Sequence, residues 1–115
     1  MSDSRFSYDG LNKIIHERAR LGILTSLVTH RDGLSFVELK KLCDLTDGNL
    51  SRHIKVLSEA GFVDVEKSFI DNRPNTLCRI TSNGEAAFNA YIEVLESIVK
   101  DASNPGVATS RLKPS

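Results

Sequence analysis

Apolar residues in the first part of the chain recur at the three- and four-residue spacing that is typical of helices. One such set begins at Leu11, behind Asp9 as a candidate cap, and a second set spans residues 21–28. The pattern is compatible with a single helix over residues 11–29 and with two helices broken near His16, and it does not decide between them.

Two short helices joined by a tight turn are predicted next. Ser35 and Glu38 form a capping box, in which each side chain accepts a hydrogen bond from the other residue's backbone N–H, so a helix begins here and runs through Cys43. Only two residues separate it from Thr46, which is a good N-cap for the following helix. Two helices so closely joined form a helix-turn-helix.

The helix that begins at Thr46 is amphipathic. Leu50, Ile54 and Leu57 share one face, and Gly61 suits the left-handed position just beyond a helix. The opposite face and its flanks carry small, polar or cationic side chains that can bond DNA bases or phosphates. These residues are Thr46, Gly48, Asn49, Ser51, Arg52 and Lys55. An ordinary solvated helix would look similar, and charge alone favours that interpretation.

Strand-like sequence follows this helix. Residues 62–65 and 77–80 are rich in β-branched and apolar side chains and favour two paired strands. The polar stretch 68–76 lies between them, with residues 71–75 as the predicted tip. A ribbon with an arginine-bearing tip directly after a helix-turn-helix is a wing, which we expect over residues 66–79.

A long final helix is predicted from a second capping box, formed by Ser82 and Glu85, to about Lys100. Its apolar stripe has an a/d-like spacing and consists of Phe88, Tyr91, Ile92, Leu95, Ile98 and Val99. Residues 1–9 are expected to be a flexible N-terminus and residues 101–115 a disordered tail. The fold class is therefore mainly α with a small β-wing (α+β), a winged helix-turn-helix over residues 10–100 with a long C-terminal helix.

The chain has no excess of positive charge. Its 15 Lys and Arg residues balance 15 Asp and Glu residues, and between residues 36 and 81 there are seven of each sign. DNA-binding domains are often strongly basic, so any positive surface must come from the placement of charges. No apolar run is long enough for a bilayer and the polar N-terminus is not a signal peptide, so we expect a cytoplasmic protein without a membrane partner.

The cysteines and histidines give no sign of a metal site. Cys43 and Cys78 lie among apolar residues and are expected to be small buried hydrophobes, with a redox-sensing thiol as the alternative. His16, His30 and His53 lack the spacing of metal ligands, and His53 is expected to be a hydrogen-bonded residue at the edge of the buried face. No metal and no cofactor are predicted.

Five segments of the chain, in order, carry a resemblance to a known family. They are RLGIL at 20–24, TDGNLSRH at 46–53, LSEAGFV at 57–63, DNRP at 71–74 and RITSNG at 79–84. Together they resemble the MarR/ArsR-like bacterial transcriptional regulators, in particular the short single-domain winged-helix members, over roughly residues 10–100.

The resemblance implies that the helix beginning at Thr46 enters the major groove and that the wing contacts DNA through Arg73 and Asn75. Arg73 would reach a phosphate or the minor groove, oriented by a local ion pair with Asp71. ArsR-type members often sense metal through a cysteine pair in the helix before the recognition helix. Here Cys43 stands alone and the final helix has no histidine, which disfavours a metal sensor.

A homodimer is expected because one recognition helix reads too few base pairs to define a site in a genome. A two-fold dimer would place two such helices in successive major grooves of a palindromic operator. The candidate dimer surface consists of Leu11, Ile15, Phe88, Tyr91, Ile92, Leu95, Ile98 and Val99. The alternative is that the stripe of the final helix only closes the core of its own monomer.

The leading hypothesis is a sequence-specific transcriptional regulator that binds double-stranded operator DNA as a homodimer. A winged helix used for protein–protein contact is the alternative, favoured by the neutral charge and opposed by Arg52, Lys55 and Arg73. The chain has no P-loop, G-x-S-x-G or H-E-x-x-H motif, so no enzymatic activity is predicted. A small-molecule effector stays open, and with one domain it would bind at the dimer interface or between the helices.

Overall fold

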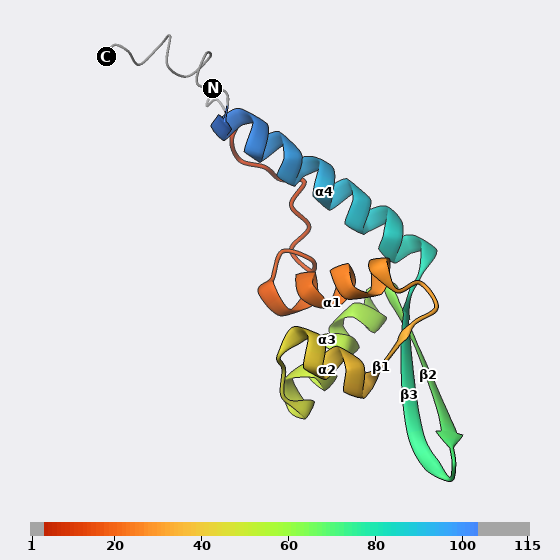
Figure 1. Cartoon of the computed structure of the whole chain (residues 1–115). Coiled ribbons are helices and arrows are strands. Elements are labelled where there is room, and N and C mark those ends of the chain that lie inside the picture. The colour runs from red at the N-terminus through yellow and green to blue at the C-terminus, as the bar shows by residue number, and fades with distance from the viewer. Residues whose placement is uncertain (1–3, 104–115) are drawn as a thin grey trace, which may run out of the picture.

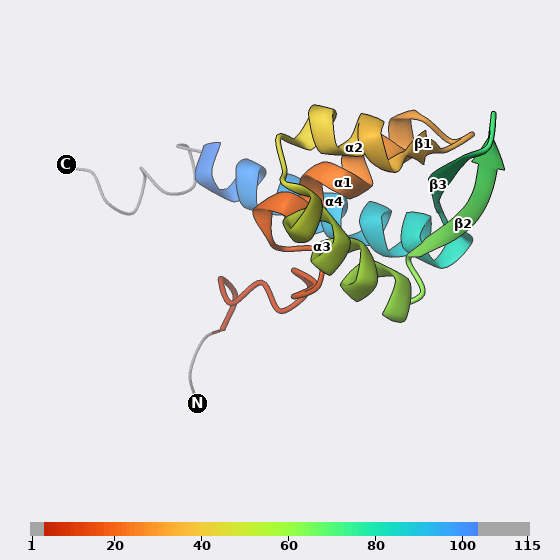
Figure 2. The same cartoon turned by 90° about the horizontal axis from the view of Figure 1, so that it is seen from below.

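A computed structural model describes residues 4–103, which form four helices and a three-stranded antiparallel sheet. In chain order the elements are α1 (Arg18–Thr29), β1 (Leu34–Ser35), α2 (Phe36–Cys43), α3 (Asp47–Glu59), β2 (Val63–Ile70), β3 (Arg73–Ile80) and α4 (Ser82–Ser103). Helix α1 lies between α4 and the α2–α3 pair, and the β2–β3 hairpin projects from one side of this body (Figure 1, Figure 2). The predicted mainly α fold with a wing and a long final helix is confirmed.

The segment before α1 is a single turn and not a helix. The Asn12 side chain accepts hydrogen bonds from the backbone N–H groups two and three residues later, at 2.8 and 3.3 Å. Helix α1 begins directly after its N-cap, Glu17, whose carboxylate accepts a hydrogen bond from the N–H of Arg20 at 2.8 Å. The helix predicted behind Asp9 is therefore wrong, because Asn12 satisfies the backbone donors of a turn that does not continue.

Both helices of the helix-turn-helix have the predicted caps. Ser35 Oγ accepts from the N–H of Glu38 at 3.1 Å, and Glu38 Oε1 accepts from the N–H of Ser35 at 2.8 Å. Thr46 Oγ1 accepts from the N–H of Asn49 at 3.2 Å. Between the two helices Asp44 adopts a left-handed φ of 54° and ends α2. Aspartate adopts this conformation more readily than most residues, so the turn can be short.

A compact junction joins α3, the wing and α4. Gly61 has a φ of 81°, and the N–H of Thr81 donates to the Phe62 carbonyl at 2.9 Å. The Thr81 hydroxyl donates to the Gly61 carbonyl at 2.6 Å and accepts from the N–H of Gly84 at 2.9 Å. One threonine therefore holds the end of α3 and the start of the wing against the first turn of α4.

This arrangement corrects the predicted limits of the final helix. Thr81 supplies the cap, so the capping box predicted at Ser82 and Glu85 is wrong by one residue, and Glu85 instead forms an ion pair with Arg31 at 2.9 Å. Helix α4 continues to Ser103, so residues 101–103 of the predicted tail are helical. The rest of that predicted tail, residues 104–115, lies outside the described residues, as do residues 1–3.

The wing is longer and its tip tighter than the sequence predicts. Strands β2 and β3 pair from Val63↔Ile80 to Ile70↔Arg73, and only two residues, Asp71 and Asn72, form the turn. Both have positive φ, 52° and 63°, as the central residues of a type I′ hairpin turn do. The predicted loop over residues 68–76 is therefore mostly strand.

The third strand, β1, is not apparent from the sequence. It has two residues, Leu34 and Ser35, which pair with Cys78 and Leu77 of β3. A two-residue strand is too short for a periodic pattern, and its pairing fixes the base of the wing beside the start of α2.

One hydrophobic core draws side chains from every helix and every strand. Its buried members are Ile15, Ile23, Leu24, Leu27, Leu34, Leu39, Leu50, Ile54, Leu57, Val63, Cys78, Phe88 and Tyr91. Within the described part of the chain, no helix combines the length and the apolar character that crossing a membrane requires.

Substituting Gly84 by alanine should destabilise the fold. A Cβ at this position would collide with the Phe62 carbonyl oxygen and lie 2.9 Å from Ile80 Cγ1, and overpacking of this kind costs about 1–3 kcal/mol. Gly48 in the first turn of α3 is the matched control, because a Cβ there meets no atom within 4 Å. Gly48→Ala should keep or raise stability. Urea unfolding measures both, and equal midpoints for the two variants would contradict the close approach at Gly84.

Candidate nucleic-acid interface

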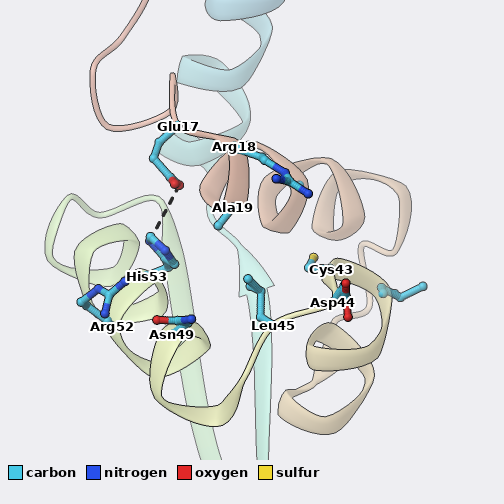
Figure 3. A pocket seen from close by; sticks show the side chains of 11 residues that line it. Glu17, Arg18, Ala19, Cys43, Asp44, Leu45, Asn49, Arg52 and His53 are labelled. Atoms are coloured by element: carbon cyan, nitrogen blue, oxygen red, sulfur yellow. Dashed lines mark ion pairs between the residues drawn. The ribbon is translucent and has the colours of Figure 1, made fainter.

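Helix α3 buries one face and exposes the other, as its sequence predicts. Leu50, Ile54 and Leu57 lie in the core. The side chains predicted to meet DNA on the opposite face are exposed, with one exception. The exposed residues are Thr46, Gly48, Ser51, Arg52 and Lys55. The exception is Asn49, which is half-buried and lines a cavity beside α1 (Figure 3).

Two basic side chains near this face are occupied by acidic partners. Lys40 of α2 forms an ion pair with Asp47 in the first turn of α3, at 2.8 Å between Nζ and Oδ1. On the wing, Arg79 pairs with Glu66 on the neighbouring strand at 3.1 Å. In these ion pairs the charges of Asp47 and Glu66 are balanced, so these carboxylates repel a phosphate backbone less.

Four other basic side chains on α3 and the wing are exposed and take part in none of the ion pairs among residues 4–103. They are Arg52, Lys55, Lys67 and Arg73. These four cations are the candidates for phosphate contacts, although Glu59, Asp64 and Asp71 on the same elements are also exposed and take part in none of these ion pairs. Lys67 is not among the residues predicted from the sequence. Its alternation with Val63 and Val65 along β2 is the signal that places it on the face of the wing toward α3.

A groove of about 530 Å³ lies between α3 and the wing. Cationic and hydroxyl side chains from both elements line it, together with apolar residues and the carboxylate of Glu59. The lining includes Ser51, Ile54, Lys55, Val65, Lys67 and Thr76. If α3 and the wing bound neighbouring grooves of a DNA duplex, the DNA backbone between those grooves would pass over this site on the protein.

The wing presents its other predicted contacts at and near the tip. Arg73 is exposed and Asn75 is half-buried. The predicted Asp71–Arg73 ion pair is wrong, because no ion pair of the described residues joins the two side chains. Asp71 acts on the backbone instead: it is the first left-handed residue of the two-residue turn.

A second cavity, of about 510 Å³, lies between α1 and the helix-turn-helix (Figure 3). His53 of α3 is buried beside it, with Nδ1 at 3.1 Å from Arg20 Nη1 and 3.8 Å from Glu17 Oε1. Arg20 also donates from Nε to the Ile14 carbonyl at 2.6 Å. His53 is therefore the hydrogen-bonded boundary residue expected from the sequence, and these contacts fix α3 against the start of α1.

The Glu17 carboxylate is held in its charged form. Partial burial alone would raise the pKa of Glu17, but the hydrogen bond from the N–H of Arg20 and the nearby side chains of His53 and Arg20 outweigh burial and lower this pKa. The ionised carboxylate of Glu17 therefore both caps α1 and lies close to His53 of α3.

The candidate dimer surface divides into two parts. Ile15, Phe88 and Tyr91 are buried within a single chain, and Tyr91 Oη lies 2.6 Å from His16 Nδ1. Their assignment to a dimer interface is therefore wrong, because they leave almost no surface for a partner. The other predicted residues are half-buried or, for Val99, 62% exposed. They are Leu11, Ile92, Leu95, Ile98 and Val99.

The segment ahead of α1 lies along α4. Tyr8 Oη donates to Asp101 Oδ2 at 2.7 Å, and Gly10 packs against Val94. Tyr8, in the segment before α1, therefore reaches the last turn of α4, and this segment runs along α4 in Figure 1.

The two cysteines have different environments. Cys78 is fully buried at the base of β3, and this burial raises the pKa of its thiol to about 11. Cys43 is half-buried, lines the cavity beside α1 and lies 3.7 Å from Ser26 Oγ. Among residues 4–103, no group of three or more His, Cys, Asp and Glu side chains is arranged to hold a metal ion.

Comparison with known sequences supports the geometry. Residues 19–99 match a family described as a winged helix DNA-binding domain. An uncharacterised protein of Methanocaldococcus jannaschii is 43% identical over 88 residues, which cover 73% of this chain and 91% of that protein. An uncharacterised HTH-type transcriptional regulator of Bacillus subtilis, YdgJ, is 29% identical over 84% of this chain and 63% of its own length.

Solved structures share the fold. A transcriptional regulator homologue from Pyrococcus horikoshii superposes with a TM-score of 0.73 at 33% identity, covering 78% of this chain and 88% of that one. MarR gives a TM-score of 0.66 at 21% identity over 85% of this chain and 74% of its own. MepR of S. aureus, in a DNA complex, gives 0.69 at 17% identity over 92% of this chain and 86% of its own. The predicted resemblance to MarR-type regulators is confirmed in fold.

Cys43 should react with a thiol reagent in the folded protein and Cys78 should not. The thiolate is the nucleophile, and at pH 8 a thiol with a pKa of about 11 is almost entirely protonated as well as shielded. Mass spectrometry after brief iodoacetamide treatment, in buffer and in urea, measures this. Equal labelling of both cysteines in buffer would contradict the burial of Cys78, and urea should abolish the difference.

Proposed function

Because the chain belongs to the family of winged-helix DNA-binding domains, we propose that it is a sequence-specific transcriptional regulator. Helix α3 reads the major groove, and the wing contacts the flanking backbone or minor groove. Ser51, Arg52 and Lys55 are the side chains that α3 offers to bases and phosphates, and Arg73 is the contact that the wing offers. A regulator of this kind acts where the DNA is, so a cytoplasmic location is part of the proposal.

The single observation that carries the proposal is the set of four exposed, unpaired cations on α3 and the wing. Arg52 and Lys55 lie on one element, and Lys67 and Arg73 on the other. Phosphates are the natural partner of cations placed along a surface that spans a helix and a wing. A docking surface for another protein would not require this separation of paired from unpaired cations.

We also propose a homodimer on a palindromic operator. The half-buried Ile98 and the exposed Val99 lie in the last turns of α4 and do not belong to the core, whereas Leu95, one turn earlier, still packs against it. A two-fold contact there would bring two α3 helices to the same side of the assembly. Half-sites one helical turn apart, about 34 Å, would suit such a pair.

The cavity beside α1 is the place we propose for any small-molecule effector. It lies between α1 and the helix-turn-helix, and Asn49, Arg52 and His53 of α3 line it. A bound molecule would therefore act directly on the orientation of the recognition helix. The chemistry of the lining does not single out one compound.

Arg52→Ala should weaken binding to the preferred duplex by about 1–3 kcal/mol and relax the preference at one base pair if Arg52 bonds guanine. The duplex is first selected from a random DNA pool with the wild-type chain. The slope of log K against log salt should be roughly −0.9 per neutralised phosphate. Lys100→Ala near the end of α4 is the charge-matched control and should leave both quantities unchanged.

The double variant Arg52→Ala plus Arg73→Ala separates the proposal from the protein–protein alternative. A regulator loses DNA binding, whereas a pure interaction module keeps its partner through α4 and never shows a salt-dependent DNA complex. A selection that enriches no sequence, with a flat salt response, would overturn the proposal.

Val99→Glu should convert the dimer to a monomer, because it places a charge in the apolar contact proposed on α4. Analytical ultracentrifugation measures the change, and binding to a palindrome should fall much more than binding to a single half-site. Val37→Glu is the control, since Val37 is a similarly exposed valine at the start of α2. Identical sedimentation of wild type and Val99→Glu would contradict this dimer surface.

A further inference from the structure

The tip of the wing carries the most exposed of the large apolar side chains in the described residues. Phe69 is 74% exposed and its neighbour Ile70 is 57% exposed, and neither packs against the core. At about 3.3 Å per residue, Phe69 stands roughly 20 Å beyond Val63, where the hairpin leaves the core. Two bulky hydrophobes in water at the end of a projecting ribbon have no role in holding the fold.

The register shows which way Phe69 faces. Side chains alternate along a strand, so Val65, Lys67 and Phe69 share one face of β2. Phe69 is paired with Pro74 and Lys67 with Thr76. Val65, Lys67 and Thr76 line the groove against α3, so the same face of the wing leads from that groove to the Phe69–Pro74 pair.

The shape of the tip limits what it can enter. The turn at Asp71 and Asn72 has only two residues, so the tip is as narrow as a two-stranded ribbon allows. Two backbones about 4.8 Å apart, with their side chains, are still wider than a narrow groove, so only a side chain at the tip would enter one. The DNA minor groove is about 6 Å wide and lies roughly half a helical turn, about 17 Å, from the major groove that α3 would read. This spacing matches the reach of the wing.

The charges beside the tip favour DNA as its partner. Lys67 precedes Phe69 on the same face, and Arg73 begins β3 directly after the turn; both are exposed and without an ion pair among the described residues. Asp71 in the turn carries the opposite charge. An apolar wedge flanked by cations fits a groove whose walls are deoxyribose and whose rims are phosphate. The tip is also continuous with the proposed DNA-binding face.

We propose that Phe69, backed by Pro74, is an apolar wedge that enters the minor groove beside the site read by α3 and partly unstacks one base step there. The inference rests on the proposed function and extends it, because Phe69 then determines specificity without bonding any base. Pyrimidine–purine steps such as TA and CA unstack most easily, so they should be preferred where the wing lands.

Phe69→Thr tests the wedge. Threonine is β-branched and favours a strand, as phenylalanine does, and the substitution at this exposed position leaves the core unchanged. On the duplex that the wild-type chain selects, the variant should bind about tenfold more weakly or worse, as expected for loss of an aromatic contact to bases. The induced bend, measured by energy transfer between dyes at the duplex ends, should decrease, and the preference for TA or CA at the wing position should disappear.

Salt dependence distinguishes the wedge from a charge effect. Phe69→Thr removes no charge, so the slope of log K against log salt should stay as in the wild type. Arg73→Ala should instead reduce the slope by about 1 and leave the bend nearly unchanged. Val37→Thr, an exposed apolar position on α2, is the matched control and should change neither quantity.

The outcomes separate the wedge from the proposed function. If Phe69→Thr binds and bends the duplex as the wild type does while Arg52→Ala loses binding, the wedge is overturned and the regulator stands, with the tip left for a protein contact. If the wild-type chain selects no sequence, both fall. A bend that decreases in Phe69→Thr with an unchanged urea midpoint and an unchanged salt slope supports the wedge.

Discussion

The junction at Thr81 is the constraint on which the arrangement of the molecule depends. Its backbone N–H and hydroxyl donate to the carbonyls of Phe62 and Gly61, which directly follow α3, and the same hydroxyl caps the start of α4. Gly84 allows α4 to approach the Phe62 carbonyl so closely that no side chain fits between. The angle between α3, the wing and α4 is therefore set within a few residues.

The second determinant is how a neutral chain distributes its charge. Lys40 and Arg79 are held by Asp47 and Glu66, and Glu38 is used as a cap. Acidic side chains therefore hold α2 to α3 and β2 to β3, while several basic side chains stay exposed. Such surface pairs contribute little stability each. Their effect is to pair Lys40 and Arg79 with acidic groups, while Arg52, Lys55, Lys67 and Arg73 stay exposed and outside the ion pairs of the described residues.

Sequence reasoning succeeded where structure depends on residues within one helical turn. The capping box at Ser35, the cap at Thr46 and the buried face around Leu50 follow from short spacings. It failed where the structure of a segment depends on residues that are distant in the sequence. Strand β1 exists only because Leu34 meets Cys78, and an apolar stripe does not reveal whether Phe88 and Tyr91 face their own core or another chain. Lys67 was missed because its role depends on which face of the hairpin meets α3.

The contact between Tyr8 and Asp101 holds the segment before α1 against the end of α4 that lies far from the wing. In a pair of copies that met at this end of α4, the first residues of one copy would lie near the last helical turn of the other. If α4 is where two copies meet, a short flexible tether would link them without crossing the DNA-facing side. Such a single-chain pair would assemble at a high effective concentration, independent of how dilute the protein is. Its two halves could then carry different recognition helices.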